Sequence, residues 1–261
     1  MKNLKKIVAA ALALCMLLCF AGCGSSNKLL VATNAEFEPF ESLDEDGNCV
    51  GFDIDLMKAI AEKMGCEVKF ENMEFDGVVA AVANETCDVS ISGLTINAKR
   101  SKSVDFSDAY YSGAAQILIV AADDTYYTGT TKEELDQQLI GQKIGVCSGF
   151  TGQSYAEGDE EWGFEGIKDA KVNIYDNVSL AIADLKSGTI NAIIMDDSVA
   201  KEAAQNNSDV AKIIDVALTV EEYGIAVKKG NTELKDKINA ALKELNDDGT
   251  VDKLLEKYDL K

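Results

Sequence analysis

Hydrophobic and polar residues follow two different periods along this chain. Short apolar runs bounded by turn residues predict buried strands, and apolar residues three and four apart predict amphipathic helices. From Leu29 onward the pattern is strand, helix, strand, helix, strand. The predicted strands are 29–33, 66–70 and 89–94, and the predicted helices are 53–64 and 77–84. Strands that are joined by helices pair in parallel, so this order predicts an α/β fold with a parallel sheet.

Turn and capping residues between these elements support the assignment of strands and helices. Residues 44–48 contain the acidic, Gly- and Asn-bearing sequence of a hairpin turn. In the helix 53–64, Leu56, Ile60 and Met64 share one face, and Gly65 follows as a C-cap. The first sheet is therefore expected to be covered by at least one amphipathic helix.

The same order returns after about residue 140. The predicted strands are 143–147, 172–175 and 190–195, with helices at 152–157 and at 178–185, the second stopped by Gly188. Two more helical patterns, 234–245 and 251–258, close the chain. Two α/β units without a Pro/Gly-rich linker predict two lobes, and ligands of such sheets bind outside the carboxyl ends of the strands. A cleft between facing lobes is the expected binding place.

The N-terminus carries the features of a signal peptide, assigned to residues 1–22. Three lysines precede an apolar run, 7–20, that is too short for a mature membrane span. The run ends in Phe-Ala-Gly before Cys23, which resembles the lipobox of bacterial lipoproteins, in which the cysteine is lipidated and becomes the first mature residue. The alternative is an ordinary secretory signal with an incidental Cys23. Residues 23–27 then form a short tether. We expect an extracytoplasmic protein anchored to the cell membrane by lipid on Cys23.

Charge excludes some partners. The formal net charge is −20, and removal of three lysines with the signal peptide takes it to −23. Such a polyanion repels nucleic acid and anionic headgroups, so nucleic acid is not an expected partner and membrane contact is expected only through the lipid anchor.

Histidine and cysteine usage narrows the chemistry. The chain has no histidine, which removes Ser-His-Asp and Cys-His nucleophile systems, His-ligated zinc and the usual general base near neutral pH. Four of the seven cysteines lie beyond Cys23, widely spaced and without a CxxC motif, which argues against a metal site. They are Cys49, Cys66, Cys87 and Cys147. One disulfide is possible but cannot be assigned, and no metal or cofactor is expected.

The segment 92–107 carries the clearest candidate chemistry. An apolar strand runs into a turn with a hydroxyl at Thr95 and a guanidinium at Arg100. Arginine can hold a carboxylate through two parallel hydrogen bonds and does not lose its charge. Arg100 is therefore a candidate anion clamp, and the alternative is a surface arginine beside Lys99 and Lys102.

Several motifs together resemble one family. The segment 51–56, Gly-Phe-Asp-Ile-Asp-Leu, looks like the signature of the bacterial extracellular solute-binding proteins, family 3, which are amino-acid receptors of ABC importers and include glutamine-, histidine- and basic-amino-acid-binding proteins. Companion motifs occur in order at 32–40, 75–77, 92–100, 105–110, 148–152, 196 and 223–226. The resemblance covers essentially the whole mature chain.

The resemblance implies a type II periplasmic-binding-protein fold. Each lobe would be a mostly parallel sheet flanked by helices, with a hinge of two strands. Lobe 1 would comprise 28–109 plus 224–261, and lobe 2 would comprise 115–218. The hinge crossings would be 110–114 and 219–223.

The resemblance also implies a site for a free amino acid. Arg100 should hold the α-carboxylate, helped by Thr95 and the Thr151 backbone N–H. Asp196 should hold the α-ammonium, helped by the Gly93 carbonyl and the Thr95 hydroxyl. A buried zwitterion needs opposite charges at both ends, because an unpaired end costs several kcal/mol. The alternative for Asp196 is a strand-end carboxylate that caps a local turn.

Side-chain recognition would rest on residues around this clamp, namely Asn34, Glu36, Phe37, Phe75 and Cys147. The two phenylalanines would sandwich the ligand, or belong to the core. Asn34 replaces an aspartate that is frequent in the family, and Glu36 could restore that charge or be a solvated loop acid. Cys147 and Phe150 also depart from the family pattern. We expect a polar amino acid, with neutral glutamine-like and cationic arginine- or lysine-like side chains both open.

Two other functions compete with a receptor that delivers an amino acid to ABC permease subunits. An enzyme like the extracytoplasmic cyclohexadienyl dehydratases would need an acid or base in the cleft, and only Glu36, Asp196 or a cysteine could serve. A sensor module would have to signal through a partner. The expectation is a monomeric receptor that is not an enzyme.

Overall fold

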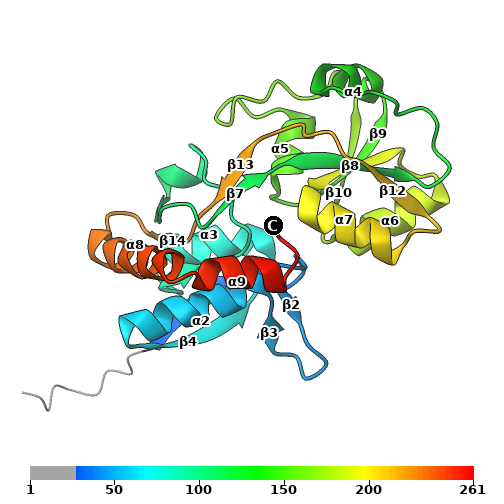
Figure 1. Ribbon diagram of the computed structural model, residues 1–261. Helices are drawn as coiled ribbons and strands as arrows, with labels where there is room; N and C mark the ends of the chain where they lie inside the picture. Colours follow the sequence, from blue (N-terminus) through cyan, green and yellow to red (C-terminus); the bar gives the residue numbers. More distant parts are fainter. Residues whose placement is uncertain (1–27) are drawn as a thin grey trace, which may run out of the picture.

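The computed structural model describes residues 28–261. Figure 1 shows two groups of strands and helices joined by a pair of neighbouring strands. The predicted signal peptide, the tether and the lipidation site Cys23 lie outside the described residues. Among residues 28–261, no helix combines the length and the apolar character that crossing a membrane requires.

Lobe 1 is built on a five-stranded sheet in the order β4-β1-β5-β14-β6. The strands are β1 (Lys28–Thr33), β4 (Glu67–Asn72), β5 (Val89–Ser90), β6 (Val104–Phe106) and β14 (Ala226–Lys228). Strand β1 pairs in parallel with β4 and β5, whereas β14 runs antiparallel to β5 and β6. The helical connections thus give the predicted parallel core, which is extended by the antiparallel strand β14 and, beyond it, by β6, which runs parallel to β5.

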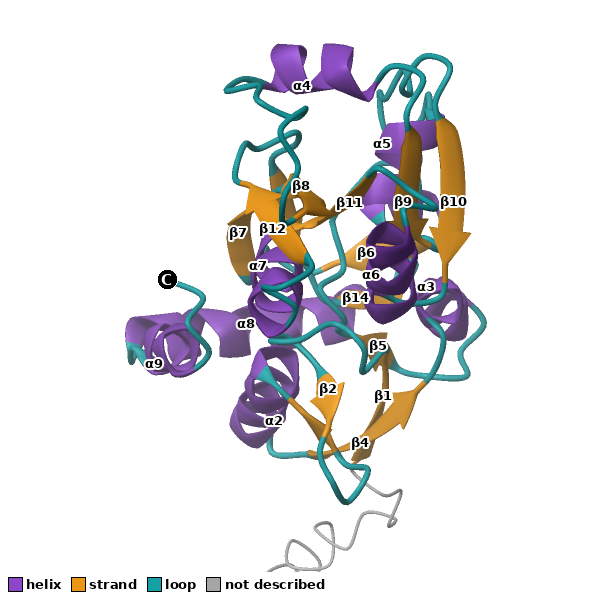
Figure 2. Ribbon diagram, turned by 90° about the vertical axis from the view of Figure 1, so that its right-hand side faces the viewer, coloured by secondary structure: helices purple, strands orange, loops and turns teal. Residues whose placement is uncertain are grey.

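Helices cover both faces of this sheet, and Figure 2 shows α2 and α3 on opposite sides of it. They are α2 (Phe52–Met64), α3 (Phe75–Ala83), α8 (Thr232–Asp247) and α9 (Thr250–Lys257); a small hairpin, β2 (Ser42–Leu43) and β3 (Cys49–Val50), precedes α2. Val31 packs with residues of α2, whereas its neighbour Ala32 packs with residues of α3. Successive side chains of a strand point to opposite faces, so β1 is buried on both. Gly65 ends α2 with φ 69°, the left-handed C-cap that was predicted.

Lobe 2 repeats the plan with the strand order β10-β9-β11-β8-β12. Its strands are β8 (Gln116–Ala121), β9 (Lys143–Cys147), β10 (Lys171–Tyr175), β11 (Ala192–Asp196) and β12 (Ala211–Ile214). Its helices are α4 (Lys132–Leu139), α5 (Thr151–Glu157), α6 (Val178–Ser187) and α7 (Asp197–Asn206). The pairs β10–β9 and β9–β11 are parallel, and β8 is antiparallel to β11 and β12.

Two strands join the lobes, as Figure 1 shows near its centre. They are β7 (Tyr111–Ala114) and β13 (Glu221–Tyr223), and they pair with each other in an antiparallel arrangement. The register of this pair shifts between Glu221 and Glu222. We call β7 and β13 the hinge strands.

The hydrophobic core runs through the junction of the lobes. One cluster of buried side chains contains Phe37 of lobe 1, Phe150 and Met195 of lobe 2, and Tyr223 of a hinge strand. The four described cysteines are free thiols, with Cys87 and Cys147 buried and the other two half-buried. No disulfide joins residues of the described part of the chain, and Cys147 and Cys87 each pack in a hydrophobic cluster.

Candidate functional site

The segment that follows β5 is bound along a hinge strand. Ile96 N donates to Glu222 O at 2.9 Å, Gly224 N donates to Leu94 O at 3.1 Å, and Thr95 forms an isolated bridge with Tyr223. The strand predicted over 89–94 therefore ends early, at Ser90, and its continuation pairs with β13 instead. This places Thr95 at the junction of lobe 1 and the hinge.

Glycine is required at position 93. Its φ is +49°, and a Cβ atom there would lie 2.4 Å from the Phe37 ring. Its N–H donates to Asp53 Oδ2 at 2.8 Å, and that same oxygen accepts the Tyr110 hydroxyl at 2.7 Å. Burial raises the pKa of Asp53 to about 6, and the backbone and tyrosine donors oppose that rise. A buried carboxyl thus fixes the backbone whose carbonyl was predicted to face the ligand.

Arg100 is held between the two lobes. Its Nη1 donates to Thr95 O at 2.9 Å, and its Nη2 donates to Gly149 O of lobe 2 at 3.1 Å. The guanidinium carbon lies 5.3 Å from the Phe75 ring centre and 5.2 Å from that of Trp162. Only 9% of the residue is exposed, which excludes the alternative of an ordinary surface arginine. Stacking on aromatic rings and two carbonyl acceptors fix the orientation of the planar group.

The charge of Arg100 survives its burial. Burial lowers its pKa to about 10, and the nearby carboxylates of Glu221 and Asp196 oppose that fall. The side chain therefore remains a cation at neutral pH, as an anion-binding group must.

Asp196 ends β11 of lobe 2 and is 3% exposed. It occupies the N-cap position of α7 but makes no side-chain capping hydrogen bond, so the local-turn alternative does not describe it. Instead, its Oδ1 accepts the Tyr223 hydroxyl at 2.7 Å. Burial and the negative charge of Glu221 raise its pKa to about 7. A carboxylate in this state gains from any cation that enters beside it.

Glu221 was not predicted from the sequence. It lies on β13 and is 6% exposed. Its Oε2 accepts the hydroxyls of Thr95 and Thr151, each at 2.8 Å. The sequence held one indication of it. A strand that crosses between two lobes should bury one of every two successive residues, so either Glu221 or Glu222 should be buried. Glu221 and Glu222 are both acidic, however, and alternation alone could not tell which one points inward.

The predicted aromatic pair is joined by a third ring. Phe37 and Phe75 each contact Phe150, with ring centres 5.4 Å and 4.5 Å apart. Phe37 also packs on Phe40 and Tyr223, so it belongs to the core. The sequence did not predict Phe150 as a site residue, but its ring contacts both Phe37 and Phe75.

The remaining predicted residues are Asn34, Cys147 and Glu36. The Asn34 amide donates to Met73 O at 3.0 Å, so a lobe 1 carbonyl holds it. Burial raises the pKa of Cys147 to about 12, so its thiol is uncharged at neutral pH. Glu36 is exposed and lines a cavity of about 530 Å³ between the lobes, together with Glu38 and Glu202. This cavity is acidic and its described lining contains no lysine or arginine.

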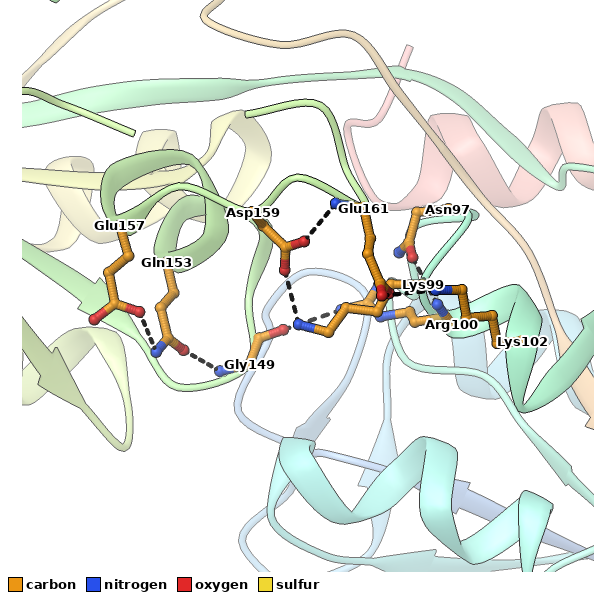
Figure 3. Close-up of polar contacts among 9 residues, drawn as sticks. All are labelled: Asn97, Lys99, Arg100, Lys102, Gly149, Gln153, Glu157, Asp159 and Glu161. Carbon is orange, nitrogen blue, oxygen red and sulfur yellow. Dashed lines mark hydrogen bonds and ion pairs between the residues drawn. The ribbon is translucent and has the colours of Figure 1, made fainter. Parts of the chain in front are cut away.

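Charged side chains bridge the lobes beside Arg100, as Figure 3 shows. Lys99 and Lys102 of lobe 1 pair with Asp159 and Glu161 of lobe 2, each at 2.7 Å. We call these four residues the ionic latch. Both lysines are more than half exposed, so each pair is a weak surface contact rather than a buried one.

Comparison with known proteins supplies the context for this geometry. The family model for "Bacterial extracellular solute-binding proteins, family 3" matches residues 29–261. The "Probable histidine-binding protein" of Neisseria gonorrhoeae is 34% identical, over 98% of this chain and 96% of its own length. The "Arginine-binding extracellular protein ArtP" of Bacillus subtilis is 33% identical, over 98% of each chain.

A solved structure has the same fold. "An ancestral arginine-binding protein bound to glutamine" superposes with a TM-score of 0.78 at 41% identity, covering 90% of this chain and 99% of that one. The three proteins are named for binding amino acids, and none of these names describes an enzyme.

Proposed function

Because this chain belongs to the bacterial extracellular solute-binding proteins, family 3, and has their type II periplasmic-binding-protein fold, we propose that it binds a free polar amino acid between its lobes and delivers it to an ABC importer. The carrying observation is that two buried, opposite charges meet at the lobe junction from different lobes. They are Arg100, which lies against the Phe75 and Trp162 rings, and Asp196, which has no buried cation of its own lobe among residues 28–261.

Each end of a free amino acid would have a partner in this arrangement. Arg100 would hold the α-carboxylate, with the Thr151 N–H at the start of α5 as a second donor. Asp196 would hold the α-ammonium, with the Gly93 carbonyl and the Thr95 hydroxyl as further acceptors. Because the two charges come from different lobes, a bound zwitterion stabilises the contact between them. This is how binding would be coupled to closure.

The side-chain end of the ligand would extend along the wall formed by Asn34, Phe37, Phe75 and Cys147, toward Glu36. The aromatic rings suit an aliphatic stem, and the acidic cavity suits a polar or cationic end. A neutral glutamine-like ligand and a cationic arginine-like ligand both remain within the proposal, since one relative is named for arginine and the similar ancestral arginine-binding protein is bound to glutamine.

The finer assignments complete the proposal. Lobe 1 would comprise 28–109 plus 224–261 and lobe 2 115–218, and both five-stranded sheets fall within these limits. Residues 110–114 and 219–223 would be the hinge. Lipid on Cys23 would anchor a monomeric protein outside the cytoplasm, from where it would reach its permease subunits.

Isothermal titration calorimetry against the twenty amino acids tests the proposal. We expect saturable binding of at least one polar amino acid with 1:1 stoichiometry, and no binding of the same compound once both its α-carboxylate and α-ammonium are blocked. Binding of none of the twenty would contradict it.

The ionic latch should contribute modestly to affinity. Replacing Lys99 and Lys102 by alanine together should weaken binding about 2- to 30-fold at low salt, because each of the two exposed pairs contributes about 0.2–1 kcal/mol. The loss should shrink at about 0.5 M salt, where screening already weakens the pairs. Lys237→Ala is the matched control, because its pair with Glu233 lies within one helix. A latch variant with unchanged affinity at low salt would show that these pairs do not support closure.

A further inference from the structure

Glu221 collects hydrogen bonds from both lobes on a hinge strand. Its Oε2 accepts from Thr95 Oγ1 and Thr151 Oγ1, each at 2.8 Å. Its Oε1 accepts from Thr219 Oγ1 at 2.6 Å and from Gln116 Nε2 at 3.1 Å. All four neighbours act as donors, so the carboxylate serves only as an acceptor.

Each of the two threonine hydroxyls therefore donates its proton to Glu221. The oxygens of Thr95 and Thr151 lie 3.2 Å apart, and each hydroxyl has a single proton. Hydrogen bonds to a charged acceptor are shorter and stronger than those between neutral groups. Both protons therefore point at Glu221, and neither lies between the threonines. The lone pairs of both oxygens remain for other donors.

The direction of these hydrogen bonds determines what the two hydroxyls can offer to an amino acid. A free hydroxyl could donate to an α-carboxylate or accept from an α-ammonium. A hydroxyl whose proton is held by Glu221 can only accept. Resting on the function proposed above, we propose that Glu221 is a positioning residue that makes the hydroxyls of Thr95 and Thr151 acceptors for the ligand's α-ammonium. The guanidinium of Arg100 and backbone N–H groups are then left to the carboxylate.

The place of Glu221 explains why a hinge residue has this role. Thr95 belongs to lobe 1 and Thr151 begins α5 of lobe 2, and both reach one carboxylate oxygen of β13. The complete set of bonds therefore needs both lobes in contact around the hinge strand. The acceptor face of the site is assembled by the same contact that encloses the ligand.

The variant Glu221→Gln tests the proposal because it keeps the shape and replaces one acceptor oxygen by a donor. We expect it to weaken binding of L-arginine or L-glutamine, whichever the protein binds, by about 10- to 100-fold. The matching compounds without the α-amino group are 5-guanidinopentanoate and 4-carbamoylbutanoate. For these weaker ligands the loss should be no more than about 3-fold. A merely structural role would lower both affinities by the same factor, and that result would overturn the proposal.

A double-mutant cycle supplies an independent readout. Glu221→Gln combined with Thr95→Val should lose little more affinity than the more affected single variant, because both remove the same acceptor. Fully additive losses would contradict action through Thr95. Glu222→Gln is the matched control on the same strand, where the side chain is exposed, and it should bind like the unchanged protein.

The experiment distinguishes failure of the proposed function from failure of the proposed role of Glu221. If the glutamine variant does not fold, Glu221→Asp should show the same selective loss, because the shorter side chain keeps the charge but draws away from the hydroxyls. Failure of the unchanged protein to bind any amino acid would overturn the proposed function and this inference together. Normal binding with equal losses for both ligand types would overturn only the role of Glu221.

Discussion

Replacing Arg100 by alanine is expected to weaken binding of every amino-acid ligand by about 10²- to 4 × 10³-fold. The α-carboxylate is common to all of them, and removing one partner of a buried charge pair costs about 3–5 kcal/mol, with each 1.4 kcal/mol equal to a factor of ten. The variant also removes the buried cation that interacts with Glu221 and Asp196. Calorimetry with the full set of binding amino acids measures the effect.

Two controls separate charge from geometry at this position. Arg100→Lys keeps a positive charge but loses the planar fork and the stacking between Phe75 and Trp162, so it should recover only part of the affinity. Lys99→Ala, next in the chain and exposed, should cost no more than a few-fold. If Arg100→Ala affected one ligand and spared another, Arg100 would belong to a side-chain subsite and the clamp would be wrong.

The second large effect is expected at Asp196 and depends on pH. Its pKa is raised to about 7, so below that pH the ligand-free protein carries a proton that must leave before the carboxylate can pair with an ammonium. Affinity should therefore fall as the pH falls below about 7, by up to about ten-fold per pH unit, and should be level just above it. Between pH 8 and pH 5 the loss should approach about 100-fold.

Asp196→Asn is expected to remove this dependence and to bind about 10²-fold more weakly at pH 8, because the α-ammonium loses its charged partner. The groups that interact with Asp196 are Glu221, Tyr223, Gln116, Arg100 and Cys147, and all of them remain in the variant. Titrations at several pH values compare the two proteins. A pH profile that persists in Asp196→Asn would assign the titration to another group.

The sequence predicted the elements whose signal is local. Strand β9 has the predicted limits, and α2 differs by one residue at its start, because apolar periodicity and Gly65 define them. The antiparallel strands β8, β12 and β14 were not predicted. Their pairing depends on which segments return to each sheet edge, and short apolar runs carry no information on that.

The site residues also divide into those with a local sequence signal and those whose position depends on pairing between distant segments. Arg100 and Asp196 could be selected because a charged residue after an apolar strand is conspicuous and matched a family motif. Glu221 could not, because its burial depends on the shifted register between β7 and β13. Glu41 is similar: it is fully buried in lobe 1, accepts the Ser92 hydroxyl at 2.8 Å, and has a pKa raised well above its ordinary value by burial and by Asp53. Acidic residues are rarely buried, so sequence reasoning assigns them to the surface.

The stacking of Trp162 on Arg100 has a practical consequence. The chain contains one tryptophan, which belongs to lobe 2, and its indole lies against a cation of lobe 1. Separation of the lobes would move that ring from a half-buried, charged surrounding into water. Its fluorescence should therefore change when the lobes separate. The kinetics of opening can then be followed in the unlabelled, unmutated protein.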